Sequence, residues 1–93
     1  MELSNFKIIK NRQRPDFCYA YEMYNENKTA KYSIFTIDGG NSFLASVITA
    51  NLNGKLVDTD FQTMVTTPEE GLKEIKNFLD NGKYTKETDE KTT

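Results

Sequence analysis

The sequence predicts an α+β fold, with an antiparallel sheet of four to five strands followed by one C-terminal helix packed on one face. Segments rich in aromatic and β-branched residues are separated by short polar turns, and one capped segment with helical periodicity follows them. Short turns favour antiparallel pairing. With 93 residues, the chain is long enough for one domain. We expect that domain over residues 1–82 and a disordered polar tail over residues 83–93.

The predicted strands are separated by residues that favour turns. They cover residues 6–10, 17–24, 32–37, 42–52 and 55–66. A polar loop over residues 11–15 follows the first strand, and the segments 25–28 and 38–41 form the next two turns. The dipeptide Asn53-Gly54 predicts a type I′ hairpin turn, in which both central residues have positive φ.

The helix is predicted over residues 68–81. Thr67 is suited to cap its first turn, Pro68 to begin it, and Glu70 to complete a capping box. Asn81-Gly82 supplies the stop. The apolar residues form one narrow stripe, which indicates that a single side of the helix packs on the sheet: Leu72, Ile75, Phe78 and Leu79.

One helix is too narrow to cover the predicted sheet. Five strands at about 4.8 Å spacing make a sheet about 24 Å wide, whereas a helix is about 10–12 Å across. Either the sheet curls strongly, or an apolar and aromatic surface remains for a partner. We expect Tyr19, Tyr21 and Tyr32 on that surface. The alternative is that these tyrosines fill the edge of the core with their hydroxyls in water.

Side-chain alternation separates the two faces of each strand. On the last strand, Val57, Phe61 and Val65 are expected to share the buried face, and Asp58, Asp60 and Gln62 the other. The fourth strand is apolar on both faces, which is typical of a strand that is central or covered on both sides.

Charge is distributed unevenly along the chain. There are 12 Lys and Arg against 14 Asp and Glu, giving a net charge of −2 and an isoelectric point near 5.1, which disfavours double-stranded DNA as a partner. A basic cluster lies near the start: Lys7, Lys10, Arg12 and Arg14. An acidic set is expected to form a partner-binding face where the last strand meets the helix: Asp58, Asp60, Glu69, Glu70 and Glu74.

The residue inventory argues against catalysis. A single cysteine and no histidine exclude a disulfide framework, a Ser-His-Asp triad, a Cys-His dyad and a zinc site of the Cys/His kind. The pattern Asp58-x-Asp60 with Glu69 resembles a calcium loop in outline, but Thr63 stands where that loop needs glycine. We therefore expect no enzyme, no cofactor and no metal site. No apolar run is long enough for a membrane span and no secretory signal is visible, so we expect a cytoplasmic protein.

Two functions fit this inventory. The first is a small interaction module that covers another protein's surface. Lys, Asn, Ile, Tyr and Phe make up 36 of 93 residues, which indicates an A/T-rich genome, so such a module fits a phage or mobile-element protein that inhibits a host defence protein in the host cytoplasm. The second is a single-stranded nucleic-acid-binding protein, with the sheet tyrosines stacking on bases and the basic cluster holding phosphates.

Self-association is also expected, as a two-fold dimer through the part of the sheet that the helix leaves bare. Lys7 and Lys10 protect the edge formed by the first strand, which favours packing through a face over pairing at an edge. Tyr19 and Tyr21 are the expected contacts.

Overall fold

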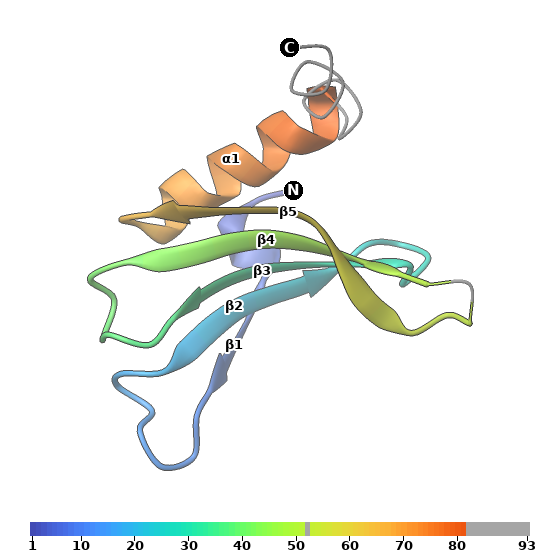
Figure 1. Ribbon diagram of the computed structural model, residues 1–93. Coiled ribbons are helices and arrows are strands. Elements are labelled where there is room, and N and C mark those ends of the chain that lie inside the picture. The colour runs from blue at the N-terminus through green and yellow to red at the C-terminus, as the bar shows by residue number, and fades with distance from the viewer. Residues whose placement is uncertain (52, 82–93) are drawn as a thin grey trace, which may run out of the picture.

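A computed structural model of the chain describes residues 1–51 and 53–81, except for the side chain of Asp58. Five antiparallel strands lie in the order β1-β2-β3-β4-β5, and one helix crosses one face of the sheet (Figure 1). The elements are a short 3-10 helix η1 (Leu3–Asn5), β1 (Lys7–Lys10), β2 (Tyr19–Tyr24), β3 (Ala30–Thr36), β4 (Phe43–Ala50), β5 (Leu56–Val65) and α1 (Pro68–Asn81). This arrangement confirms the predicted α+β fold with its C-terminal helix. The tail predicted over residues 83–93 lies outside the described residues.

The start of α1 follows the capping pattern, with one difference. Thr67 Oγ1 accepts a hydrogen bond from the Glu70 backbone N–H at 3.1 Å, as an N-cap residue does. The Glu70 carboxylate accepts from the backbone N–H and hydroxyl of Thr66, at 2.8 and 3.1 Å, instead of from Thr67. These two bonds hold the pKa of Glu70 below its usual value. The carboxylate thus joins the end of β5 to the first turn of α1.

The turn between β4 and β5 differs from the type I′ turn that the sequence predicts. Gly54 has a φ of +86°, and the Asn51 backbone N–H donates to the Lys55 carbonyl at 2.7 Å, so three residues and not two lie between the paired ends of the turn. The Gly54 N–H donates to the carbonyl of Asn51 at 3.0 Å, and the Asn51 side-chain oxygen accepts from the N–H groups of Asn53 and Lys55. The Asn51 side chain therefore helps to close a longer turn, in which Gly54 adopts a left-handed conformation.

The core lies between α1 and one face of the sheet. Ile75 of α1, Ile34 of β3 and Ala45 of β4 are fully buried there. Phe78 stacks on Phe61 of β5, with ring centroids 4.8 Å apart. The remaining buried hydrophobic residues are Phe6, Ala30, Tyr32, Phe43, Val47, Val65 and Leu72. The helix contacts β3, β4 and β5, so its coverage ends near the middle of the sheet.

Irregular pairing between β4 and β5 changes which residues share a face. Val47 pairs with Phe61 but Ile48 pairs with Thr59, so the register skips Asp60, and a second shift skips Val57. Thr59 takes the place that strict alternation gives to Asp60, next to Gln62 on the same face. The expectation that Val57 shares the buried face of Phe61 and Val65 is wrong, because Val57 is 55% exposed.

Candidate interaction surface on the open face of the sheet

The face of the sheet turned away from α1, called the open face below, carries one continuous row of apolar residues. Because directly paired residues of neighbouring strands point to the same face, the register fixes the members of this row. Its members, one from each strand, are Ile9, Ala20, Phe35, Leu44 and Met64. We call these five residues the apolar row. It crosses the whole sheet without a charged residue.

The apolar row is accessible to a partner. Met64 is 61% exposed, Ile9 47% and Phe35 37%, while Ala20 and Leu44 are half-buried. Ile37 follows β3 on the same side and is 68% exposed. Taking about 200 Å² for a fully exposed large side chain, the four large exposed residues present roughly 400 Å² of apolar surface, the size of the largest patch on a typical monomer. Patches of this size are often functional.

The row deepens into a hollow where β1, β2 and β3 meet the β1–β2 loop. The hollow has a volume of about 360 Å³. Its apolar lining comes from Ile9, Cys18, Ala20, Phe35 and Ile37. Cys18 is half-buried and contributes a small apolar side chain to this lining. The hollow is therefore suited to an apolar side chain of a partner.

A polar row lies next to the apolar row on the same face and limits its extent. It consists of Lys7, Glu22, Ser33, Ser46 and Gln62. Glu22 forms an ion pair with Lys31 of β3, with 3.6 Å between the Lys31 Nζ and a Glu22 carboxylate oxygen. Beyond the polar row, Tyr24 pairs with Lys31 and is exposed. The open face thus carries an apolar side and a polar side.

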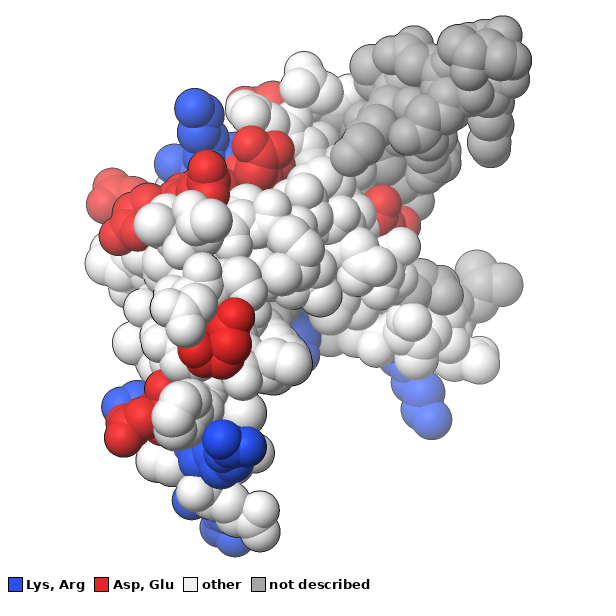
Figure 2. Space-filling view, turned by 60° about the vertical axis from the view of Figure 1, so that its left-hand side comes forward, with Lys and Arg blue, Asp and Glu red and all other residues white. Residues whose placement is uncertain are grey.

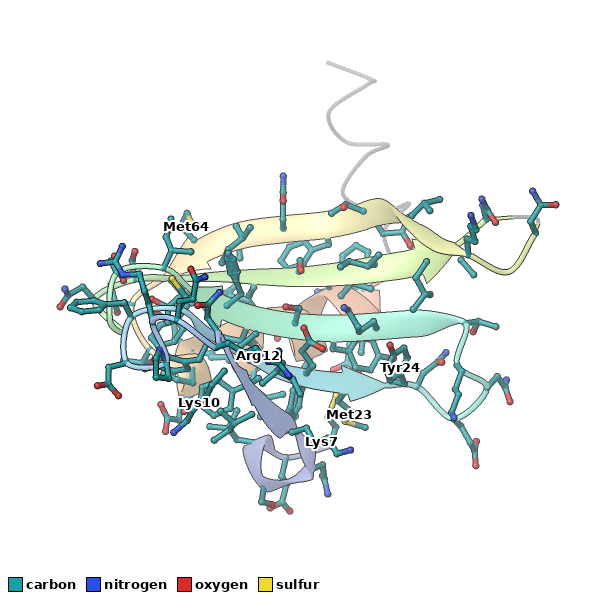
Figure 3. The ribbon with its side chains drawn as sticks, turned by 90° about the horizontal axis from the view of Figure 1, so that it is seen from below. Lys7, Lys10, Arg12, Met23, Tyr24 and Met64 are labelled. Carbon is teal, nitrogen blue, oxygen red and sulfur yellow. The ribbon has the colours of Figure 1, made fainter. Side chains whose placement is uncertain are left out.

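The basic cluster borders the β1 margin of the open face, but its members do not form one track. Lys7 pairs with Glu22 and points to the open face, whereas Lys10 pairs with Tyr19 and points to the helix side. Arg12 and Arg14 belong to the β1–β2 loop, which lies at the bottom of Figure 1, below the sheet. In Figure 3, which looks onto the open face, Lys7, Lys10 and Arg12 lie toward the β1 side and Met64 at the opposite margin.

The β1–β2 loop is held in shape by local hydrogen bonds. The Asn11 side-chain oxygen accepts from the backbone N–H groups of Gln13 and Arg14, both at 2.9 Å. The Arg14 carbonyl accepts from the N–H groups of Phe17 and Cys18. The Arg14 guanidinium lies 4.9 Å from the centroid of the Phe17 ring. The cations of the loop are therefore presented on an ordered scaffold.

The three predicted tyrosines lie on the helix side and not on the open face. Tyr32 is only 8% exposed, so its predicted role as an exposed contact is wrong. Tyr19 and Tyr21 are half-buried, and both rings contact Phe43, with centroids 6.1 and 6.5 Å apart. The register puts all three on the same side as Ile34, which α1 covers. The alternative that they fill the edge of the core fits these positions better.

Burial also affects the chemistry of Tyr21. It raises the pKa of the Tyr21 hydroxyl, and the neighbouring Tyr19 and Glu69 raise it further, because an ionised Tyr19 and the Glu69 carboxylate would repel a Tyr21 phenolate. The hydroxyl therefore stays protonated at neutral pH and acts as a polar tip at the margin of the core.

The predicted acidic residues are spread along the molecule. Glu69 and Glu70 are exposed in the first turn of α1, and Glu74 is half-buried one turn later. Asp60 precedes Val65, at the end of β5, by five residues, which is about 17 Å along a strand. Figure 2 shows acidic side chains at the upper left and again at the centre and lower left, with Lys and Arg side chains both at the upper left and at the lower tip. Asp60 therefore lies apart from the three glutamates of α1, and the side chain of Asp58 lies outside the described part of the chain.

Asp38 has a structural role that the sequence did not reveal. Its carboxylate accepts hydrogen bonds from the hydroxyls of Thr36 and Ser42, both at 2.7 Å, and from the backbone N–H groups of Asn41 and Ser42, both at 3.0 Å. These bonds, the Ser42 hydroxyl first, hold the pKa of Asp38 far below its usual range. They fix the β3–β4 turn, next to which Ile37 projects.

Within the described residues, no three His, Cys, Asp or Glu side chains lie together in a way that could hold a metal ion. The one described α-helix is neither long nor apolar enough to cross a membrane. No protein family model, curated protein or solved structure matches the chain.

The apolar row could not be identified from the sequence, although the apolar character of two of its strands could be. Phe35 and Leu44 belong to strands that are apolar on both faces. Because Tyr32 and Ile34 sit beside Phe35 on a strand of this kind, the alternation alone does not say which set the helix covers. The register and the position of α1 decide it.

Proposed function

We propose that this protein is a non-enzymatic module that binds another protein through the open face of its sheet. The observation that carries the proposal is the apolar row, which spans all five strands and remains uncovered by α1. A standard interface buries roughly 800 Å² on each partner, with an apolar centre and a polar rim. The apolar row supplies such a centre, and the polar row beginning at Lys7 supplies part of such a rim.

The distribution of aromatic residues favours a protein partner over single-stranded nucleic acid. Stacking of successive bases needs neighbouring aromatic side chains. On the open face, Phe35 pairs with Ala20, and Tyr24 lies four residues further along β2, which is about 13 Å away. The tyrosines expected to stack on bases lie on the helix side. A partner with apolar side chains matches the row better.

The mode of action that we propose is occlusion. A module of this kind acts by covering a surface that its partner needs, as an inhibitor of a host defence protein encoded by a phage or mobile element would. The A/T-rich coding composition and the negative net charge support this origin and role.

Affinity capture with variants of the open face tests the proposal. We expect the unmodified chain to capture a protein from host lysate in about equimolar amount, and Met64→Asp combined with Ile9→Asp to lose it. Val57→Asp is the matched control, because Val57 has a similar exposure but lies outside the row. Circular dichroism should show that all the variants remain folded. Equal capture by the row variant, or no equimolar partner across a range of salt concentrations, would overturn the proposal.

A further inference from the structure

We infer that the partner presents an acidic amphipathic segment to the open face, with an apolar side chain in the hollow and carboxylates facing the cations of the β1 margin. This inference rests on the proposed function, since it names the chemistry of the surface that the open face binds. Two independent features carry it: the apolar lining of the hollow and the unpaired cations beside it.

The hollow and the cations are adjacent. Ile9 and Asn11 line the hollow. Arg12 follows Asn11 directly in the loop, and Lys7 lies two residues before Ile9 on the open face. An apolar side chain that enters the hollow therefore brings its neighbours along the partner chain within reach of these cations.

These cations have no internal partner in the part of the chain that the structure describes. None of Lys7, Lys10 and Arg12 lies within 4 Å of a carboxylate of that part. Glu22, the acidic residue opposite Lys7 in the register, is instead paired with Lys31. Asp16 is the only acidic residue between Lys7 and Cys18, where four basic residues occur, so the segment carries a charge of +3. A partner surface with carboxylates is complementary to it.

An acidic amphipathic segment would contact both the apolar hollow and the cations, whereas nucleic acid would contact the cations alone. Phosphates would be attracted to Lys7 and Arg12, but they would leave the apolar hollow uncovered. The order of the β1–β2 loop favours recognition of a defined segment, because the Asn11 and Arg14 hydrogen bonds reduce the entropy lost when the loop cations are engaged.

A random peptide library displayed on phage and selected against the immobilised full chain tests the inference. We expect the enriched peptides to combine large apolar residues with Asp and Glu. Measured by fluorescence anisotropy, the affinity of an enriched peptide should fall at least tenfold with Lys7→Glu combined with Arg12→Glu. Lys73→Glu combined with Lys76→Glu is the matched control, since it makes the same charge change at exposed positions of α1 and should leave the affinity within about twofold.

The outcomes separate this inference from the proposed function. Enrichment of neutral or basic peptides, or equal loss in both charge-reversal variants, overturns the acidic partner. If the enriched peptides are neutral or basic but their binding is lost with Phe35→Asp, only the acidic partner is ruled out, and the open face remains the binding surface. If they bind independently of Phe35, or if no peptide is enriched, both ideas fail. Tighter binding of a 16-nucleotide oligothymidine than of any enriched peptide, lost with Lys7→Glu and Arg12→Glu, would overturn the inference in favour of nucleic acid.

Discussion

Gly71 of α1 lies against Ile34 of β3 so closely that a methyl group on Gly71 would come within 3.0 Å of Ile34 Cγ2 and 3.4 Å of Ala45 Cβ. Ile34 and Ala45 are fully buried, so neither has free space to move into. The absence of a side chain at residue 71 lets the helix approach the sheet and bury Leu72 and Ile75. The same packing places Ile34 under α1, so Phe35, the next residue of β3, faces outward.

Replacing Gly71 with alanine should destabilise the protein. Alanine favours a helix over glycine by about 1 kcal/mol, but overpacking of a rigid core costs about 1–3 kcal/mol. We expect a net loss of about 1 kcal/mol in the free energy of unfolding, measured with urea. Asn77→Ala, at an exposed position of α1, should gain a few tenths of a kcal/mol. Stabilisation by Gly71→Ala would contradict the close packing of α1 on Ile34.

Removing the helix cap should also have a measurable cost. Thr67→Ala leaves the Glu70 backbone N–H without its side-chain acceptor, and loss of such a cap costs about 1 kcal/mol. The change should appear as a lower denaturant midpoint. Thr67→Ser keeps the hydroxyl and should remain within about 0.3 kcal/mol of the unmodified chain. If alanine and serine behave alike, the hydroxyl of Thr67 does not cap α1.

The hydrogen bonds of Asp38 should make stability depend on pH. The pKa of Asp38 is lower in the folded chain than in the unfolded chain, where an aspartate titrates near 3.9. Its contribution is therefore fully present above about pH 4 and is lost as the pH falls further toward the folded pKa. Asp38→Asn should lower the melting temperature at pH 7 and weaken its dependence on pH below 4. Asp80→Asn, at an exposed position, serves as the control, and an equal change in both variants would count against this role.

The sequence predicted the positions of the helix and the strands more accurately than the face of the sheet on which each residue lies. The bounds of α1 follow from local signals, because Thr67, Pro68 and the apolar stripe each mark a position in the helix. β3 starts at Ala30, two residues before its predicted start, because the Asn25 side chain accepts hydrogen bonds from the N–H groups of Thr29 and Ala30 and tightens the turn. Such side-chain closure is difficult to infer from residue types alone.

The open face depends on relationships between distant residues. Alternation along β2 and β3 left open which of the two faces α1 covers, and the contact between Gly71 and Ile34 places α1 on the face of Tyr21 and not on that of Phe35. The skipped residues of β5 likewise shift Val57 out of the face that alternation assigns to it. Neither effect leaves a local sequence signal, which is why the predicted tyrosines and the apolar row differ.

In the absence of a partner, we expect a second copy of the chain to cover the apolar row at high protein concentration, as a weak two-fold dimer. Because Tyr21 is half-buried against Phe43 and lies near Glu69, Tyr21→Glu would lower stability and is a poor test. The Met64→Glu variant should instead sediment as a folded monomer at high micromolar concentration, where the unmodified chain sediments as a dimer. Ile8→Glu, exposed on the helix side of β1, should leave the dimer intact. A monomeric unmodified chain, or a dimer that survives Met64→Glu, would show that a second copy does not cover the row.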